Sequence, residues 1–448
     1  MLYCGYQKAA GAAERKRPQL LSSGAYIALG IFILVYALII SEKVQRTVVA
    51  LCGAALMVMA GILPQDKAIT HIDFNTLGLL IGMMVIVDIT ADTGLFHFLA
   101  IWAAKKVHAR PRMLLAAMAV LTAVCSGFLD NVTTVLLTVP ITFHLCERLH
   151  IPVMPFLLAQ IMASNIGGTA TLIGDPPNIM IGSAVPALDF VAFLTNLGLV
   201  CLIILAVTVS ILVLIYRKEM VTETFLRESI MELDEKKEIT DPVLLKKCLF
   251  VLALVVAGFI FHSQLGWETA TIALAGAAFL MLLTIHDDED AISERFGHVE
   301  WVAIFFFIGL FIVIGGLVET GVIDALARAA VKETADNTAA ATMLILWLSA
   351  IASAFIDNIP FVATMIPLIK DMGAMGMPDL TPLWWALSLG ACLGGNGTLI
   401  GASANVVVAG LARQHGVKLS FMKYTLLGFP LMILSIAIST VYLWLRYL

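Results

Sequence analysis

The chain has 448 residues, of which 60% are hydrophobic and only 13% are charged. A soluble domain carries about twice that share of charged residues, so the composition excludes a water-soluble globular enzyme, a disordered chain and a disulfide scaffold. A net charge of -5 offers no basic field for a nucleic-acid partner. A membrane crossing needs about 20 apolar residues, and the length leaves room for roughly ten crossings.

The order of apolar and polar stretches predicts an all-α polytopic membrane protein built from two halves. Each half combines long apolar runs with a re-entrant hairpin of two short apolar arms and a transmembrane helix broken by Gly and Pro. The predicted segments are a polar N-terminal tail at 1–22, a first transmembrane repeat at 23–216 with its hairpin at about 113–147 and broken helix at about 153–194, a charged cytoplasmic linker at 217–244, and a second repeat at 245–448 with its hairpin at about 341–370 and broken helix at about 382–412.

An internal repeat is the strongest signal in the sequence. The segment 126–131, which reads Ser-Gly-Phe-Leu-Asp-Asn, matches 353–358, which reads Ser-Ala-Phe-Ile-Asp-Asn, at an offset of 227 residues. The same offset pairs two Gly-Gly steps and places Asn178 on Asn405. An odd number of predicted crossings separates equivalent points, so the two repeats have inverted topology. Inverted repeats with interrupted helices are typical of secondary transporters.

The positive-inside rule sets the expected orientation. Most of the 27 Lys and Arg residues fall on the side of the 217–244 linker, among them Lys43 and Arg46. We therefore expect this side to be cytoplasmic. That orientation places both termini outside, against which the basic N-terminal tail argues.

The first candidate site is the pair of predicted hairpin tips, Asp130-Asn131 and Asp357-Asn358. Ionisable side chains within apolar segments are costly and usually face a cavity. At the membrane midplane these carboxylates, without a fixed partner, could bind Na⁺ or exchange a proton, and the hydroxyl of Thr133 adds a ligand. The alternative is that Asp and Asn only cap broken helices.

The second candidate site is the pair of interrupted helices. Glycines allow close backbone approach, and freed carbonyls, half-helix ends, hydroxyls and amides can hold an ion. The alternative is close helix packing through small residues. Asp175 falls opposite Ala402, so the halves are not chemically equivalent. The candidate residues are Asn165, Gly167, Gly168, Thr169, Thr171, Gly174, Asp175 and Asn178 in the first repeat, and Gly395, Asn396, Gly397, Thr398, Ser403 and Asn405 in the second.

Other polar positions are weaker candidates. Asp88 lies in an apolar run opposite Gly315, and Asp92 and Glu319 lie near predicted segment ends. The sequence contains no P-loop, and no nucleophile–base arrangement stands out. We therefore expect no enzymatic activity and no cofactor beyond a coupling ion, H⁺ or Na⁺.

At these motifs the chain resembles the ArsB/NhaD family of the ion transporter superfamily, and most closely its melanosomal P protein branch. The residues that carry the resemblance are the segments 128–134, 165–168, 173–178, 356–361 and 390–405. The resemblance covers nearly all of the chain after residue 25. It implies two inverted repeats with re-entrant hairpins, often around a dimer-forming scaffold, and hence a homodimer in the lipid bilayer.

One departure bears on the substrate. The more distantly similar dicarboxylate carriers have Ser-Asn-Thr at the hairpin tips, where this chain has Asp130-Asn131-Val132 and Asp357-Asn358-Ile359. A carboxylate at each tip disfavours a dianion and favours a cation, a proton or a neutral solute such as arsenous acid. Within the motif segments, no Arg or Lys could clamp a carboxylate.

We therefore expect a multi-pass secondary transporter of a bacterial-type inner membrane that moves a small inorganic ion. Proton-coupled efflux of arsenite or antimonite is the leading interpretation, and an arsenite pump of this type could add a separate ATPase subunit. Na⁺/H⁺ antiport is the alternative, and a further one is an anion transporter or channel of the P protein type. A membrane scaffold without transport is the least favoured interpretation.

Overall fold

The computed structural model describes residues 22–41, 43–285, 289–334 and 337–448. All regular secondary structure in these ranges is helical. The predicted polar tail at 1–22 lies outside the described residues except for Ser22.

Ten helices of the described chain form the first repeat: α1 (Ser23–Ser41), α2 (Arg46–Met59), α3 (Gln65–Thr70), α4 (Phe74–Ala91), α5 (Leu95–Lys106), α6 (Pro111–Phe128), α7 (Asn131–Arg148), α8 (Met154–Thr169), α9 (Pro176–Ala184) and α10 (Phe190–Ile215). The second repeat comprises α12 (Pro242–Leu265), α13 (Thr269–Thr284), α14 (Glu289–Gly297), α15 (Trp301–Glu319), α16 (Val322–Thr334), α17 (Thr338–Phe355), α18 (Asn358–Ala374), α19 (Thr381–Gly394), α20 (Ser403–Gln414) and α21 (Phe421–Tyr447). Each helix of the first set has a counterpart in the second at, or within a few residues of, the same sequence offset.

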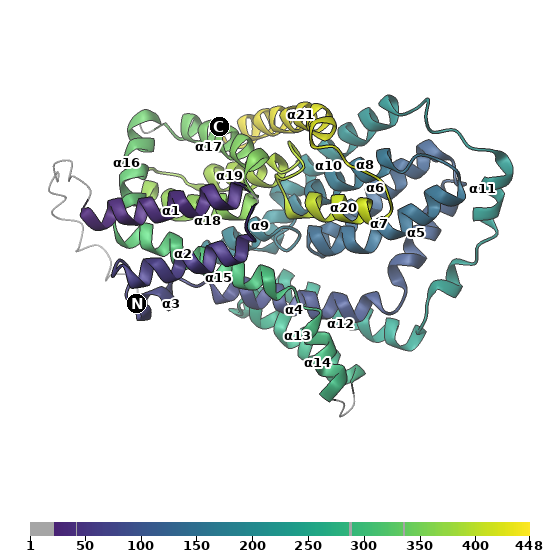
Figure 1. Ribbon diagram of the computed structural model, residues 1–448, viewed down its shortest axis with the longest axis horizontal. Coiled ribbons are helices and arrows are strands. Elements are labelled where there is room, and N and C mark those ends of the chain that lie inside the picture. Colours follow the sequence, from purple (N-terminus) through teal and green to yellow (C-terminus); the bar gives the residue numbers. More distant parts are fainter. Residues whose placement is uncertain (1–21, 42, 286–288, 335–336) are drawn as a thin grey trace.

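The segment between the repeats is partly helical. It contains α11 (Thr224–Met231) and a short 3₁₀ helix, Glu235–Glu238. Helix α11 buries Leu226 and Ile230, so the predicted solvated linker packs on the first repeat through one apolar face. Figure 1 shows it running along the edge of the molecule past α5 and leading into α12.

Two predicted boundaries are wrong by a few residues, and helix caps explain both. Helix α12 begins at Pro242 rather than 245, because Asp241 caps it by accepting the amides of Val243 and Leu244. The predicted broken helix at 153–194 includes the start of α10, which Asp189 caps. A carboxylate before a first helical turn satisfies amides that lack an intrahelical partner.

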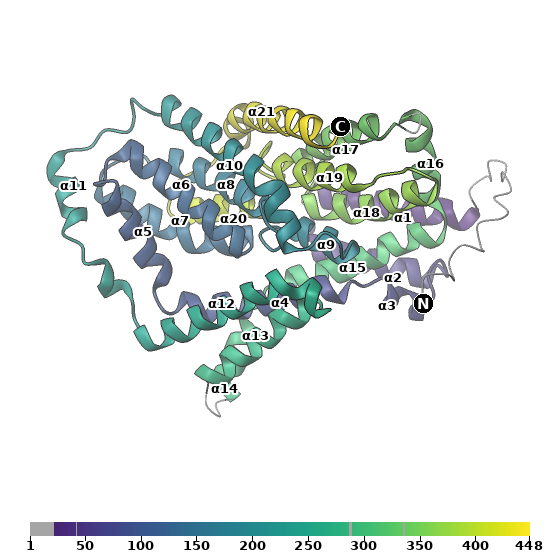
Figure 2. The ribbon, with the colours of Figure 1, turned by 180° about the vertical axis from the view of Figure 1, so that it is seen from behind.

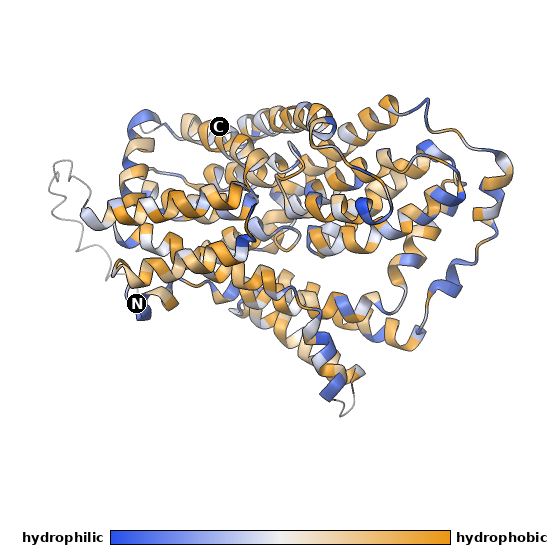
Figure 3. Cartoon of the chain, in the orientation of Figure 1, coloured by the Kyte–Doolittle hydropathy of each residue, from blue (hydrophilic) through white to orange (hydrophobic). Residues whose placement is uncertain are grey.

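Eight helices in the described part of the chain are long and apolar enough to cross a membrane. Helices α1 and α12 bury only 22% of their apolar windows, so most of their apolar surface faces outward, as expected of helices in contact with lipid. Apolar residues cover the helices of the bundle, whereas hydrophilic residues collect on α11, α14 and α3 (Figure 3).

The two repeats interlock through matched helix pairs. Helix α4 of the first repeat packs on α13 of the second, and α2 packs on α15 in the same way. Glycines allow both contacts: a Cβ on Gly82 would lie 2.5 Å from the carbonyl carbon of Ala273, and one on Gly309 would lie 2.6 Å from that of Ala50. These paired helices form a layer along one side of the molecule (Figures 1 and 2).

The half-helices that follow the two interruptions, α9 and α20, each pack against helices of the opposite repeat. Helix α20 of the second repeat lies against α7 and α8 of the first, and α9 of the first repeat lies against α18 and α19 of the second. Both views show α20 beside α7 (Figures 1 and 2). Each hairpin, α6–α7 or α17–α18, therefore meets a half-helix of the opposite repeat at the centre of the molecule.

The close contact at Gly82 gives a first prediction. Replacing Gly82 with Val would drive a side chain into the backbone of α13, and overpacking of this kind costs about 1–3 kcal/mol or more. We expect a lower midpoint of thermal unfolding for the purified protein in detergent. The matched control is Gly30→Val on α1, where an added Cβ has open space. Equal midpoints for the two variants would contradict the packing at Gly82.

Candidate functional site

The first hairpin tip is held by its own carboxylate. Asp130 precedes α7, and its Oδ1 accepts the amides of Val132 at 2.9 Å and Thr133 at 2.8 Å. The hydroxyl of Thr133 donates to the other oxygen. Asp130 thus caps the helix, and Thr133 serves the tip as a donor to Asp130.

The second tip is held differently. Asp357 accepts only the amide of Ile359 from its own helix, at 3.2 Å. Its second oxygen accepts the guanidinium of Arg46 and the hydroxyl of Ser403, the latter at 2.9 Å. The expectation that both tip carboxylates lack a fixed partner is therefore wrong for Asp357, because Arg46 reaches it from α2.

The interrupted helices satisfy their free backbone groups internally. The hydroxyl of Thr171 donates to the carbonyl of Gly127 at 2.5 Å, and Thr398 makes the equivalent bond to Ala354. The side-chain amide of Asn178 donates to three carbonyls around the first interruption. Asn405 does the same with two carbonyls around the second. Because these four polar side chains bond to backbone carbonyls of the protein itself, they stabilise the two interruptions.

The glycines at the interruptions make close packing possible. A Cβ on Gly167 would lie 2.1 Å from the carbonyl oxygen of Ala123 on α6. One on Gly168 would lie 2.5 Å from the carbonyl oxygen of Gly174 across the same loop. In the second repeat a Cβ on Gly394 would lie 2.6 Å from the carbonyl oxygen of Ala350, whereas one on Gly395 would meet no atom closer than 3.0 Å. A Cβ on Gly397 would lie 2.7 Å from the Cβ of Ala354. This geometry agrees with the alternative given in the sequence analysis, in which the glycines serve close helix packing.

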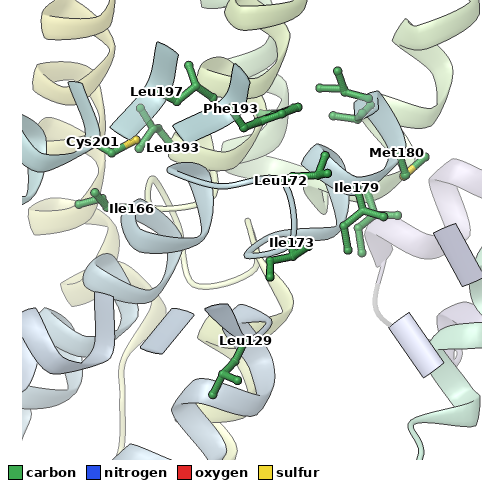
Figure 4. Packing of buried hydrophobic residues seen from close by; sticks show 14 of the residues in the cluster. Leu129, Ile166, Leu172, Ile173, Ile179, Met180, Phe193, Leu197, Cys201 and Leu393 are labelled. Atoms are coloured by element: carbon green, nitrogen blue, oxygen red, sulfur yellow. The ribbon is translucent and has the colours of Figure 1, made fainter. Parts of the chain in front are cut away.

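Apolar side chains fix the loop between α8 and α9 from both sides (Figure 4). Leu172 and Ile173 of the loop are 2% and 3% exposed. Figure 4 places them between the tip of the first hairpin and α10, in the same apolar cluster as Leu129, Phe193, Leu197 and Cys201. The loop that leads into α9 is therefore packed into the core through these two side chains.

Buried amides join the two repeats at the centre. The Nδ2 of Asn165 on α8 donates to the Oδ1 atoms of Asn396 and Asn405, at 2.9 and 3.0 Å. Its own oxygen faces Asn131 Nδ2 at 3.3 Å. Thr169 donates to the carbonyl of Asn165 within α8. The network ties the first hairpin tip and both interruptions together.

A cavity of about 310 Å³ lies between the hairpin tips and the paired helices. Five residues of the two candidate sites line it: Asp130, Asn131, Asp175, Asn358 and Ser403. Arg46, Glu300, Phe306 and Phe307 complete its polar and aromatic wall. Of the described residues that line this cavity, three are carboxylates and one is a cation, so its lining is acidic.

Asp175 is bound by the second repeat rather than by its own helix. It precedes α9 but makes no side-chain capping bond there. Both of its oxygens instead face Asn358 Nδ2 of the second hairpin tip, at 3.3 Å. Asp175 is 1% exposed, so a buried carboxylate of one repeat meets a buried amide of the other.

The candidate Na⁺ ligands are divided between two cavities. Asp130, Asn131 and Asn358 line the central cavity, whereas Asp357 lines a smaller one of about 170 Å³. Arg46 lines both and stands between them. The other candidates, Asn165, Gly167, Gly168, Thr169, Thr171, Gly174, Asn178, Gly395, Asn396, Gly397, Thr398 and Asn405, support the backbone and the amide network rather than the lining of these cavities.

The sequence analysis missed Arg46 and Glu300. The counterpart of Arg46 is Ala273, so the repeat carried no signal for it, and the orientation count assigned it to a cytoplasmic loop. Glu300 could have been found from the repeat, because it lies 227 residues after Asp73 and both acids directly precede a long apolar helix.

The weaker acids lie outside the central cavity. Asp88 on α4 and Asp92 just after its end both bind Arg295, at 3.0 and 2.6 Å, and Asp88 also contacts His298. In the other half Glu319 binds Lys67 at 2.6 Å. These acids are therefore paired at the ends of α4 and α15.

Two inverted repeats of membrane-length helices, each with a hairpin and a broken helix around a shared polar cavity, define a polytopic membrane transporter. The model of the citrate transporter family, CitMHS, matches residues 36–390. The chain belongs to this family.

Proteins with curated descriptions show the same relationship. The chain is 43% identical over 427 residues to an uncharacterized transporter of Mycobacterium tuberculosis, covering 94% of this chain and 98% of the relative. It is 42% identical to the 46 kDa membrane protein of Mycobacterium leprae, covering 94% and 99%. It is 37% identical to the human P protein, covering 93% of this chain and 59% of that protein.

Among solved structures, the YdaH transporter of Alcanivorax borkumensis has the same fold. The TM-score is 0.55 at 14% sequence identity, and the match covers 94% of this chain and 98% of that one. At this identity the similarity concerns the fold alone. The predicted relationship to the P protein is confirmed, whereas the narrower ArsB/NhaD assignment remains a prediction.

The amide network gives a second prediction. Asn165→Ala removes the donor to Asn396 and Asn405 and leaves buried acceptors unsatisfied, at a cost of about 1–3 kcal/mol each. We expect a clearly lower midpoint of thermal unfolding. Ser439→Ala is the control, because that buried hydroxyl bonds only within its own helix, to the carbonyl of Ser435. An Asn165→Ala midpoint no lower than that of the control would show that the network is not stabilising.

Proposed function

We propose that the chain is a secondary active transporter whose central cavity binds a cation, and that Na⁺/H⁺ antiport is the function this site supports best. The observation that carries the proposal is the charge of the cavity. Asp130, Asp175 and Glu300 line it against one guanidinium, and that guanidinium is already paired with Asp357.

The chemistry of the lining favours a small hard cation. Carboxylate and amide oxygens are the ligands that such cations prefer, and an ionised carboxylate in a low-dielectric site needs a positive partner. Asp175 and Asn358 come from opposite repeats and face each other across 3.3 Å. A Na⁺ held between them would contact both halves at once, and protons taken up by Asp175 and by the other acids of the cavity, Asp130 and Glu300, could replace its charge.

The inverted repeats supply the means of alternating access. Each hairpin tip meets a half-helix of the other repeat at the cavity. A rigid movement of one hairpin and its partner half-helix against the paired α4, α13, α2 and α15 would expose the cavity to one side at a time, as in other transporters with inverted repeats.

Proton-coupled efflux of arsenite or antimonite is the second candidate, as for the ArsB/NhaD family that the chain resembles. The observation that favours it is the cavity volume of about 310 Å³, which exceeds what a bare Na⁺ needs. A neutral trihydroxy acid could donate hydrogen bonds to the carboxylates and to Asn131 and Asn358.

Anionic substrates fit the lining less well. Citrate, which names the family model, would bring three further carboxylates to an acidic cavity unless a cation came with it. The same repulsion weighs against an anion channel of the P protein type. The setting we propose is a bacterial-type inner membrane, with a homodimer as the assembly and an ATPase subunit only in the case of an arsenite pump.

The proposal gives a third prediction. In proteoliposomes with an imposed pH gradient, the protein should drive Na⁺ uptake, and Asp130→Asn and Asp175→Asn should each reduce the rate at least tenfold, because each removes a charge that binds the cation. Asp189→Asn is the matched control. Asp189 caps α10 away from the cavity, and Asn is an equally good cap, so its rate should equal that of the wild type.

Uptake assays with the same vesicles distinguish Na⁺/H⁺ antiport from arsenite or antimonite transport and from anion transport. Antimonite or arsenite uptake driven by the pH gradient, with no Na⁺ movement, would replace antiport by the second candidate. Uptake of citrate or chloride at a rate unaffected by Asp130→Asn and Asp175→Asn would contradict cation binding in the cavity.

A further inference from the structure

Two cavities lie toward opposite ends of the paired helices α4 and α15. The central cavity extends to Glu300 and Ala303 at the beginning of α15, but on α4 it begins only at Leu80. Another cavity, of about 570 Å³, reaches Asp73 at the beginning of α4 and Gly315 in the last turns of α15. We call it the outer cavity. Of the described residues that line the two cavities, none lines both.

The central cavity is directed toward the side of the 217–244 linker. Arg295 of α14, shortly before α15 begins, binds Asp92 just after the end of α4. Thr240 of the linker donates to the carbonyl of Asp92. The beginning of α15, the end of α4 and the linker thus lie at one end of the bundle, and the outer cavity, at the beginning of α4, lies at the other.

At the outer cavity, Ser183 near the end of α9 joins that half-helix to the beginning of α4. Its hydroxyl donates to Asp73 Oδ1 at 2.9 Å, and the Nδ2 of Asn75 donates to the hydroxyl at 3.2 Å. Asn75 is itself fixed, because its Oδ1 accepts the amide of Ala270 in the first turn of α13 at 2.9 Å. We call Asp73, Asn75 and Ser183 the outer latch.

The equivalent positions on the linker side cannot form such a latch. The counterparts of the three latch residues, at the offset of 227, are Glu300, Val302 and Gly410. Val302 has no polar side-chain atom, and Gly410 has no side chain. Helix α20 therefore lacks the bond to the beginning of α15 that α9 makes to the beginning of α4.

A second contact of the moving parts is equally one-sided. The hydroxyl of Tyr36 on α1 donates to the carbonyl of Pro360 at 2.7 Å and lies 3.0 Å from the hydroxyl of Thr364, so it ties the second hairpin to α1. The counterpart of Thr364 is Leu137, and α12, which corresponds to α1, contains no tyrosine. The first hairpin has no equivalent of this bond.

We infer that Asp73, Asn75 and Ser183 are positioning residues that form a one-sided latch, which makes the conformation with the central cavity directed toward the linker the resting state of the chain. This inference rests on the part of the proposed function in which the second hairpin and α9 move against the paired helices. It does not depend on which ion is carried.

The argument follows from the pseudo-two-fold symmetry of inverted repeats, by which the conformation open to the other side exchanges the conformations of the two repeats. In that conformation Ser183 would leave Asp73 and Asn75. Val302 and Gly410 would then take the equivalent places without forming a hydrogen bond in return. Each intramolecular hydrogen bond shifts an equilibrium by roughly 2- to 12-fold, so the two bonds of Ser183 favour the observed conformation by about fivefold or more.

The test measures from which side the central cavity can be reached. A cysteine in place of Val132 is the reporter, because Val132 and its counterpart Ile359 both line this cavity, and the position therefore faces it in either conformation. Cys4 and Cys52 are replaced by serine. A membrane-impermeant thiol reagent is added to intact cells or to inverted vesicles, and a cysteine in place of the exposed Glu232 identifies the preparation that presents the linker. The readout is the labelling rate from the outer side divided by that from the linker side.

Ser183→Ala should raise this ratio by about fivefold or more, because the rate from the outer side follows the population of the other conformation. Tyr36→Phe should raise it as well. Ser183→Thr keeps the hydroxyl and should keep the wild-type ratio. Ser435→Ala is the matched control, because that buried hydroxyl bonds only within α21, and it should leave the ratio unchanged.

An unchanged or lowered ratio in Ser183→Ala overturns the inference. An equal rise of both rates also overturns it, because Ser183 would then only tighten the packing, and so does a ratio in Ser183→Thr as high as in Ser183→Ala. A reporter that is labelled from neither side in any variant contradicts the opening of the cavity. Protein that gives the expected ratios but moves no Na⁺ in proteoliposomes would refute the proposed antiport alone, so the two failures are distinguishable.

Discussion

The structure depends on one constraint, which is that a helix interrupted inside a membrane must satisfy its freed backbone groups from within the protein. This chain does so with short polar side chains from neighbouring elements. Thr171 and Thr398 donate to carbonyls in the first arm of the hairpin of their own repeat, α6 or α17. Asn178 and Asn405 bond back across their own interruptions. The close contacts at the glycines follow, because these bonds form only where backbones approach within a few ångströms.

Because each half-helix packs against the opposite repeat, the two interruptions together form one shared site. Because α9 packs on the second hairpin and α20 on the first, neither repeat can complete the cavity alone. The carboxylate of Asp175 faces an amide of the opposite repeat, and Asn165 bonds to Asn396 and Asn405 across the same boundary. Because both repeats contribute to its wall, any movement of one repeat relative to the other would change the shape of the cavity.

The sequence predicted the parts of the fold that repeat. Asp130 and Asp357, Gly168 and Gly395, and the two asparagines at 178 and 405 share an offset, and helix periodicity and caps locate the hairpins around them. The exchange of α9 and α20 could not be predicted, because a repeat pattern specifies equivalent positions but not which copy of a helix each one contacts. The tip acids were recognised as functional candidates, and the structure shows that both accept amides at the start of their own helices, which is the capping alternative.

Arg46 was not predicted as a site residue because the two repeats differ at its position, and this difference also affects the charge of the site. Two identical halves meeting at one cavity would bring equal sets of carboxylates together, and their repulsion would oppose the closed arrangement. Two differences between the repeats reduce this repulsion: Ala402 occupies the position equivalent to Asp175, and Arg46 the position equivalent to Ala273. The second repeat thus lacks one acid, and Arg46 of the first repeat places a fixed cation beside Asp357. Such differences cannot be found by looking for what two repeats share. They appear only when the repeats are compared for what they do not share, and in this cavity the unmatched positions decide which carboxylates have a fixed cation beside them.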